Sequence, residues 1–101
     1  MAAEQGDLLK VNGISFPIIV VSNNFFNSSG KAIVCPIVRN VSEGPLHIRL
    51  KDSPVEGIVL CEQVRYLDLA SRSYSRLGAL QFFETINISD AVMGMFDYQT
   101  L

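Results

Sequence analysis

The segment Val55–Arg72 constrains this chain most, because an apolar strand in it runs straight into a cluster of polar side chains. At a rise of ~3.3 Å per strand residue, carboxylate, amide and guanidinium groups gather near one end of that strand. Such groups can hold a phosphate and move a proton beside it. A solvated ion pair at a strand end is the alternative interpretation. The polar positions are Glu62, Gln63, Arg65, Asp68 and Arg72.

The composition predicts one small domain spanning residues 1–101. Of the 101 residues, 49% are hydrophobic and 18% are charged, which favours an ordered core over disorder. The formal charge of −2 gives no overall attraction to nucleic acid, so an RNA or DNA site needs a local basic patch or two subunits. A domain this apolar is expected to cover part of its surface with a partner, most simply in a twofold dimer.

The two cysteines and the chain start indicate a reducing compartment. Cys35 and Cys61 lie in apolar, strand-like runs, so we expect buried free thiols, with a disulfide as the alternative. No apolar run approaches the ~20 residues of a membrane span. The start, Met1–Asp7, carries acid where a secretion signal has basic and then apolar residues. We therefore expect a cytoplasmic protein that does not enter a membrane.

Turn residues divide most of the chain into short strands. Asn12-Gly13 predicts a two-residue hairpin turn, because both residue types tolerate positive φ. Asn23–Lys31 is rich in turn residues and is expected to be a loop. Pro36 lacks a backbone donor and indicates an edge strand or a bulge. The predicted strands are Leu8–Val11, Ile14–Ser22, Ala32–Val38, Leu46–Leu50 and Val55–Leu67.

The C-terminal part is expected to be helical. Ile88, Val92, Met95 and Phe96 lie at helical spacing, which predicts one helix within about Gln81–Asp97 that packs on the sheet. Strands followed by a helix predict a mainly β (α+β) fold. We expect a strongly bent antiparallel sheet or small open barrel with a C-terminal helix on it.

Four segments carry a resemblance to a known family. The specific one is Val55–Arg72, which is similar to the "GVVLxDQVRxLDxxxR" signature of the MazF/PemK (Kid-like) toxins of type II toxin–antitoxin systems. The resemblance implies an SH3-like (PemK-type) barrel, a homodimer and a cognate antitoxin. It also implies sequence-specific cleavage of single-stranded RNA to 2′,3′-cyclic phosphate and 5′-hydroxyl ends, without metal or cofactor. The other segments are Gly6-Asp7, Pro17–Ser22 with Phe26-Asn27, and Val34–Ile37.

The chain departs from this family at two positions. The polar loop before the second strand is short, Asn12–Phe16, so Phe16 takes the position of the loop arginine. The threonine that follows the third strand in the family falls on Val38. Phe16 cannot stabilise charge as a guanidinium does, and Val38 has no hydroxyl. Two groups that many members use for chemistry are therefore missing.

Other side chains are candidates for the catalytic roles. Arg65 matches the signature arginine that plasmid-type members use on the phosphate, and Asp68 would accept the 2′ proton or, as we expect, orient Arg65. Arg39 could replace the lost loop cation, and His47, the only imidazole, could titrate near neutrality. The alternatives are a salt bridge to Asp68 or Glu62 for Arg65, a solvated strand end for Arg39 and a structural role for His47. The predicted RNA-binding residues are Arg72, Arg76, Gln63, Glu62 and, for base stacking, Phe26.

Two other functions stay open at this point. One is a non-catalytic toxin of the same fold, similar to the CcdB gyrase poisons, in which the apolar tail Met93–Leu101 would dock on DNA gyrase. The tail lacks the tryptophan-containing ending of CcdB, which argues against that target. The other is a degenerate member that only binds an antitoxin or nucleic acid. In a toxin, we expect the antitoxin to insert an acidic segment into a groove that holds Arg65 and Arg39.

Overall fold

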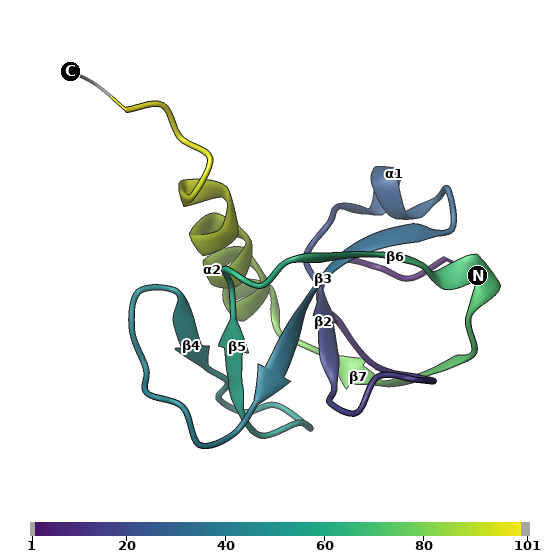
Figure 1. The fold of residues 1–101 in the computed structure, drawn as a ribbon, viewed down its shortest axis with the longest axis horizontal. Coiled ribbons are helices and arrows are strands. Elements are labelled where there is room, and N and C mark those ends of the chain that lie inside the picture. The colour runs from purple at the N-terminus through teal and green to yellow at the C-terminus, as the bar shows by residue number, and fades with distance from the viewer. Residues whose placement is uncertain (1, 100–101) are drawn as a thin grey trace.

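The computed structural model describes residues 2–99, so Met1, Thr100 and Leu101 lie outside the described residues. Figure 1 shows seven strands and two helices in this part of the chain. In chain order they are β1 Asp7–Val11, β2 Ile18–Val20, α1 Asn24–Asn27, β3 Lys31–Val38, β4 His47–Arg49, β5 Ile58–Leu60, β6 Arg65–Asp68, β7 Tyr74–Ala79 and α2 Phe82–Gly94, with a 3-10 turn at Leu69–Ser71 between β6 and β7.

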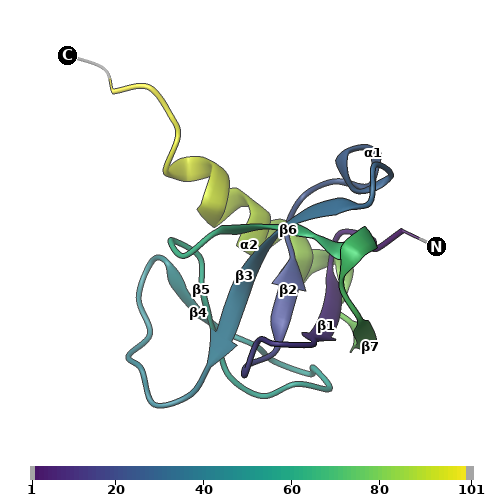
Figure 2. The ribbon, with the colours of Figure 1, turned by 45° about the vertical axis from the view of Figure 1, so that its right-hand side comes forward.

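The strands form an antiparallel sheet organised around β3, in the order β4-β5-β3-β2-β1-β7. β2 pairs along one edge of β3. The other edge is shared, because β6 pairs with residues 31–34 and β5 pairs with Ile37 and Val38. Figures 1 and 2 show the result, with β4 and β5 on one side of β3 and β1, β2 and β7 on the other. Within residues 2–99 the sheet does not close, so the predicted bent sheet with a C-terminal helix is confirmed in its open form.

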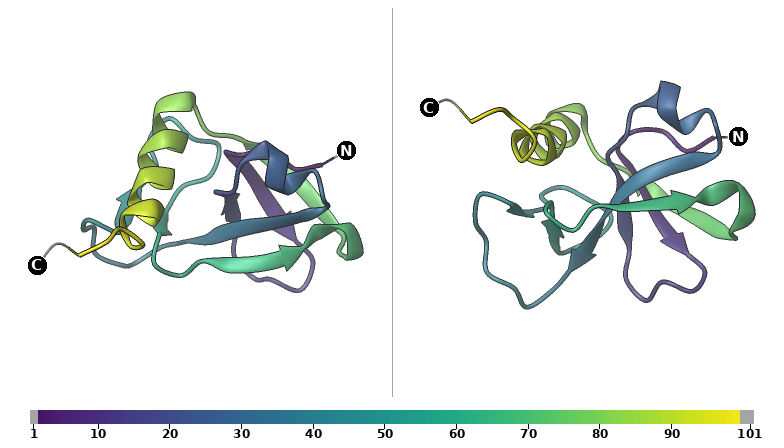
Figure 3. Two further views of the ribbon diagram at one scale, coloured as in Figure 1. Left: turned by 90° about the horizontal axis from the view of Figure 1, so that it is seen from above. Right: turned by 45° about the horizontal axis from the view of Figure 1, so that its top comes forward.

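The strands β1, β2, β3 and β5 are mostly buried, and two cores lie on opposite faces of β3. Along β3, Ile33 and Cys35 face the core that also contains Ile88 of α2, and Ala32 and Val34 face a second core beneath β6. Figure 3 shows α2 lying over the β4–β5 side, where it covers the first core. Each large side chain that is fully buried contributes ~1.5–3 kcal/mol to folding. The two cores therefore hold both halves of the sheet onto one strand.

The predicted strand Val55–Leu67 is wrong as a single element. It forms β5 and β6, which are separated by a turn at residues 61–64. Cys61 N donates to Leu46 O (2.8 Å), which is the last contact of this segment beside β4, and Gln63 N donates to Leu60 O (3.1 Å) in the turn. The chain then crosses to residues 31–34 of β3, where β6 pairs. β7 was not predicted from the sequence, because every residue in it is at least partly exposed and it lacks an apolar alternation.

The predicted turn at Asn12-Gly13 is present, but the connection between the two strands is longer than the two residues that were predicted. Ile14 N donates to Val11 O (3.1 Å) around the turn, and Gly13 alone takes a positive φ, of 89°. The strands do not resume directly, because Leu9 pairs with Ile18 and leaves residues 12–17 as the connection. The predicted strand Ile14–Ser22 is therefore reduced to β2.

The predicted loop Asn23–Lys31 contains the short helix α1. The Asn23 side chain caps it by accepting a hydrogen bond from Phe26 N (2.9 Å). Such capping uses the same residue types that mark turns, which is why the sequence pattern indicated a loop.

Pro36 lies in the central strand and not at an edge, contrary to the prediction. Ile37 N donates to Pro17 O (2.9 Å), so the neighbouring Pro36 nitrogen points away from β2. On that side β6 ends opposite Val34 and β5 begins opposite Ile37. The missing donor therefore faces the gap between β6 and β5, where no ladder bond is lost.

The predictions for the helix and the cysteines are largely confirmed. α2 lies within the expected range, and it buries Ile88 and Val92. Phe96 lies beyond the helix and is 72% exposed, because the chain projects away from the body there (Figure 1). Cys35 and Cys61 are buried and free, and burial raises their thiol pKa values to about 12 and about 11. Across residues 2–99, no helix has the length and apolar character to span a membrane.

Candidate functional site

Arg65 begins β6, directly opposite Val34 of β3. Its side chain is exposed and has no ion-pair partner among residues 2–99. Asp68 does not orient it, which corrects the expectation from the sequence. The two residues are three positions apart on a strand and therefore point to opposite faces. Arg65 is a cation that stays open to an anionic ligand.

Asp68 pairs with Lys31, its direct cross-strand neighbour on β3, at 3.2 Å. The Lys31 ammonium holds the pKa of the Asp68 carboxyl below its ordinary value. The paired oxygen of Asp68, Oδ1, is buried and has no hydrogen-bond partner of good geometry. Among the described residues, the Lys31 ammonium is therefore the one charged group that compensates it. The pair ties β6 to β3. Sequence reasoning missed Lys31, because a cross-strand partner far along the chain leaves no local signal.

His47 and Glu62, which were predicted separately, are brought together. His47 is on β4 opposite Leu60 of β5, and Glu62 follows β5 in the turn toward β6. His47 Nε2 lies 3.1 Å from Glu62 Oε2, and His47 Nδ1 lies 3.1 Å from Ser42 O. Both partners are acceptors, so an imidazolium that donates from both nitrogens fits this site.

The two groups shift each other's protonation in opposite directions. The hydrogen bond that Glu62 accepts from His47, followed by the one that the Ser42 carbonyl accepts, raises the pKa of His47 above its ordinary 6.5. The same contact with His47 is the largest cause that lowers the pKa of Glu62 below 4.5. The contact thus favours the carboxylate form of Glu62 and the imidazolium form of His47, and each side chain is about one third exposed. This is the combination that general acid–base chemistry needs.

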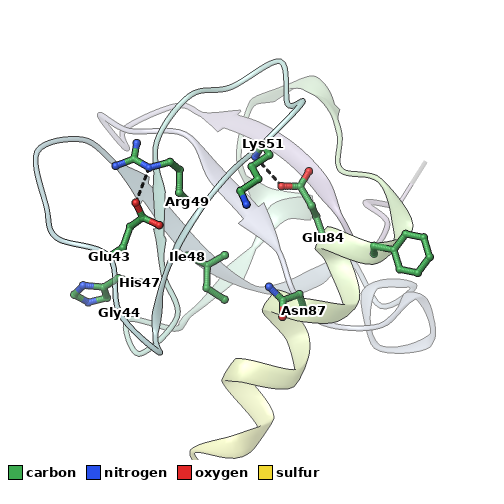
Figure 4. Close-up of a pocket in the computed structure, with 9 residues that line it drawn as sticks. Glu43, Gly44, His47, Ile48, Arg49, Lys51, Glu84 and Asn87 are labelled. Carbon is green, nitrogen blue, oxygen red and sulfur yellow. Dashed lines mark hydrogen bonds and ion pairs between the residues drawn. The ribbon is translucent and has the colours of Figure 1, made fainter.

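A hollow of about 530 Å³, the helix hollow, lies between β4 and α2 beside His47. Arg49 Nε donates to Glu43 Oε2 (2.9 Å) at one wall, and Glu84 Oε2 of α2 accepts from Lys51 N (2.8 Å) at the other. Figure 4 shows these groups on opposite sides of the hollow. The hollow is lined by Glu43, Gly44, His47, Ile48, Arg49, Lys51, Phe83, Glu84 and Asn87. Sequence reasoning missed it because its two walls are distant in the chain.

Comparison with known proteins decides the family. The family described as "PemK-like, MazF-like toxin of type II toxin-antitoxin system" matches residues 10–96. This chain belongs to that family. It is 32% identical over 92 residues to the endoribonuclease toxin ChpB of Escherichia coli (strain K12), a match that covers 74% of this chain and 78% of the relative.

Solved structures show the same fold. The MazE–MazF crystal structure (Form-I) from Deinococcus radiodurans has a chain with a TM-score of 0.83 at 22% identity, covering 95% of this chain and 97% of that one. An endoribonuclease in complex with its cognate antitoxin, from Mycobacterial species, gives a TM-score of 0.81 at 17% identity, covering 94% and 95%.

The two positions at which this MazF-like chain lacks the expected groups lie in one place. Phe16 and Val38 both line a second hollow of about 450 Å³, the proline hollow, together with Arg39. Pro17 and Pro54 add further apolar wall. Phe16 and Val38 therefore add apolar wall to this hollow, and Arg39 and Glu56 are the charged residues that line it.

None of the hollows described above is lined by both Arg39 and Arg65, and the expected antitoxin groove that holds both stays a prediction. Arg39 directly follows β3, whereas Arg65 lies opposite Val34. At ~3.3 Å per strand residue, the five residues from Val34 to Arg39 span up to ~16 Å. The Arg39 guanidinium lies 3.7 Å from Glu56 Oε2, and both side chains are largely exposed.

The predicted RNA-binding residues of this MazF-like toxin are not gathered in one place. Arg76 Nε donates to the buried Asp7 carboxylate (3.0 Å), a contact that stabilises the β1–β7 pair. Phe26 is partly exposed on α1. Gln63 is exposed in the turn before β6, and Arg72 is half-buried after it. Their roles in binding RNA stay predictions. Within the described residues, no three His, Cys, Asp or Glu side chains form a metal-binding group.

Proposed function

We propose that this chain is the endoribonuclease toxin of a type II toxin–antitoxin pair and that it cleaves single-stranded RNA. The family match and the similarity to ChpB, which is named an endoribonuclease toxin, support the class. The observation that carries the reaction is the contact between Glu62 and His47, the proposed base and acid, at 3.1 Å.

In the proposed reaction the ribose 2′-hydroxyl attacks the adjacent phosphate. The O2′–P bond forms and the P–O5′ bond breaks, which leaves a 2′,3′-cyclic phosphate and a free 5′-hydroxyl. Glu62 takes the 2′ proton, and the His47 imidazolium gives its Nε2 proton to the leaving O5′. Once Glu62 has gained the 2′ proton, it no longer attracts the His47 Nε2 proton as a carboxylate does. The first proton transfer therefore favours the second. The reaction needs no metal or other cofactor.

Arg65 is the proposed cation for the phosphate. Its side chain is exposed and lacks an ion-pair partner among the described residues, and it follows Glu62 by three positions. A guanidinium there stabilises the charge that develops on the pentacoordinate phosphorane. Asp68, in contrast, is engaged by Lys31 and is assigned a structural role.

The proposed partners are a second copy of the chain and a cognate antitoxin, both in the cytoplasm. The Deinococcus and Mycobacterial structures that share the fold are described as a MazE–MazF structure and as a complex with a cognate antitoxin, which supports the second. An antitoxin segment that blocks the site would have to reach His47 or Arg65, because Arg39 and Arg65 lie apart.

The test is to incubate the purified protein with a mixed single-stranded RNA and to map the 5′-hydroxyl ends. Cleavage by the wild type, a loss of about 100-fold or more in Glu62→Gln and His47→Gln, and a comparable loss in Arg65→Ala are expected. Asp90→Asn, an exposed acid on α2, is the matched control. An RNA of the same sequence with 2′-deoxyriboses must stay intact. Full activity of Glu62→Gln would contradict the mechanism. Growth arrest with stalled DNA gyrase and no cleavage would favour a non-catalytic toxin.

A further inference from the structure

The turn after β1 contains the single Asn-Gly pair of the sequence, Asn12-Gly13, and both residues are exposed. Ile14 N donates to Val11 O around the turn (3.1 Å), and Gly13 has a φ of 89°, which fits a type II turn. Among residues 2–99, no backbone hydrogen bond holds the Asn12 carbonyl or the Gly13 N–H, and a Cβ at Gly13 would meet nothing within 4 Å. The peptide unit between the two residues is therefore free to rotate.

We propose that Asn12-Gly13 is a site of spontaneous covalent modification, at which water converts the asparagine to aspartate and isoaspartate and ammonia leaves. The modification needs no enzyme and no cofactor. The proposal goes beyond the proposed function and does not depend on it, because it rests on the turn alone.

The reaction passes through a succinimide ring that closes inside the turn. The Gly13 nitrogen gives up its proton to hydroxide and attacks Cγ of Asn12. The N–Cγ bond forms and the Cγ–Nδ2 bond breaks, and Nδ2 takes a proton from water and leaves as ammonia. Water then adds to one of the two ring carbonyls. Opening at Cγ gives aspartate, whereas opening at the main-chain carbonyl gives isoaspartate, in which the main chain runs through the side-chain carbons.

The turn lets the reacting atoms meet without unfolding of the domain. Rotation of the Asn12–Gly13 peptide unit converts a type II turn into a type I turn and keeps the hydrogen bond between Ile14 and Val11. On one path of this rotation the Gly13 nitrogen passes the Asn12 side chain. Gly13 permits the rotation, because glycine takes positive and negative φ about equally readily.

Another exposed asparagine provides a contrast within the same chain. Asn40 is followed by Val41. The branched side chain of Val41 is stiff and shields the nitrogen that would have to attack. Asn12 is therefore expected to react well before Asn40.

Isoaspartate changes the main chain at a point where it has little slack. It adds one atom between two hydrogen bonds that fix the turn, from Asn12 N to Ser73 O (2.8 Å) and from Ile14 N to Val11 O (3.1 Å). Ile14 is 5% exposed and belongs to the second core, so the added atom pushes against a packed side chain. Aspartate keeps the length of the main chain and only adds a negative charge two residues from Lys10. Isoaspartate is therefore the product that loosens the turn.

The connection that isoaspartate loosens leads to the proline hollow. Residues 12–17 join β1 to β2, and Phe16 and Pro17 at the end of this connection line the hollow. The modification is therefore expected to change a wall of this hollow as well as the stability of the fold.

The first test follows the full-length protein during incubation in warm, mildly alkaline buffer. Intact mass spectrometry should show the gain of an amide-to-acid exchange, and peptide mapping should place it at Asn12 and not at Asn40. The rate should rise with pH and lie within about tenfold of that of a short peptide with the sequence of residues 8–16, because the turn moves locally. Asn12→Gln, which would have to close a larger ring, is the matched control and should lose the reaction.

Two results of this test would overturn the proposal. One is an Asn12 that stays intact after the peptide has been fully converted, because the fold would then protect the turn. The other is a mass gain that Asn12→Gln retains, because the reacting amide would then lie elsewhere.

The second test compares the effects of the two products. The isoaspartyl form is separated by chromatography and identified with an isoaspartyl methyltransferase. It should lower Tm by about 4–8 °C and speed the hydrogen exchange of the Ile14 amide. Asn12→Glu adds the charge without the extra main-chain atom and should keep Tm within about 2 °C of the wild type. An isoaspartyl form with wild-type Tm and exchange, or an equal loss in Asn12→Glu, would refute the loosening by isoaspartate.

Discussion

One edge of β3 is shared by β6 and by β5, which in turn pairs with β4, and the two sides hold their charged side chains in opposite ways. On the β6 side, Lys31 and Asp68 are locked opposite each other by four successive cross-strand pairs. On the β4 side, His47 and Arg49 belong to a strand of three residues, and their partners Glu62 and Glu43 lie in turns and loops. The signature segment Val55–Arg72 spans both sides, because it contains β5, Glu62 and β6. The difference teaches that this segment forms a rigid frame at β6, while its Glu62 joins His47 at the less regular β4 side to supply the groups suited to proton transfer.

The largest expected effect is a difference in RNA cleavage rate between a variant on the β4 side and a variant on the β6 side. Glu62→Gln should lower the initial rate of RNA cleavage by about 100-fold or more, because the general base is lost. Asp68→Asn should keep the rate within about threefold, because Asp68 only joins β6 to β3. Initial rates on a fluorogenic single-stranded RNA measure both. A larger loss in Asp68→Asn than in Glu62→Gln would reverse the comparison.

A second change weakens the attachment of β4 and β5 to β3. Gly57 precedes β5 with a φ of 146°, and an added Cβ would lie 2.7 Å from Ile37 Cγ2 and 2.8 Å from Val38 O. Gly57→Ala should therefore lower the free energy of unfolding by about 2–4 kcal/mol in urea titrations. Gly94→Ala, where nothing lies within 4 Å, is the control and should have little effect or stabilise α2. Equal losses in both variants would show that the close contact at β5 is unimportant.

The third prediction concerns the protonation of the β4 side. His47 is the only histidine, so its NMR titration is unambiguous. Its pKa should lie above 6.5 in the wild type and fall toward 6.5 in Glu62→Gln, because the main contact that favours the imidazolium is removed.

Cleavage activity should follow the same groups. It needs ionised Glu62, whose pKa is lowered, and protonated His47, whose pKa is raised, so it falls below pH 4.5 and again as pH rises through the His47 pKa. A rate that keeps rising through that alkaline range would argue against His47 as the acid.

The smallest effect is expected on the β6 side. Lys31→Met should lower Tm at neutral pH by about 4 °C or less, because the pair is partly exposed. The folded-state pKa of Asp68 is lowered, so its contribution is present above pH 3.8 and is lost as pH falls through that lowered pKa. The difference in Tm between wild type and variant should therefore vanish in acid. A Tm difference that persists after Asp68 has been fully protonated by acid would come from packing of the lysine stem.

Local patterns in the sequence predicted most of the frame. The spacing of apolar residues along the sequence located β1, β3, β4 and α2. This spacing is a local signal, because it reflects which side of a single strand or helix faces a core. The family resemblance supplied the fold and the class.

The parts that were missed depend on contacts between distant segments. The break between β5 and β6 follows from two strands sharing one edge of β3, and no local pattern in Val55–Leu67 encodes that. The partner of Asp68 and the walls of the helix hollow likewise come from different parts of the chain. For the candidate site, His47 and Glu62 were both named from the sequence, but their contact was visible only in three dimensions.

The two apolar faces of β3 have a consequence for how this strand finds its alignment. In a strand with one wet face, a slip by one residue exposes the core side chains to water and is rejected. In β3 such a slip would only exchange Ile33 and Val34 between two dry cores. Pro36 forbids the exchange, since its nitrogen would then turn toward β2, where Ile37 now donates to Pro17 O. A ring that makes no ladder bond thus keeps the central strand in register.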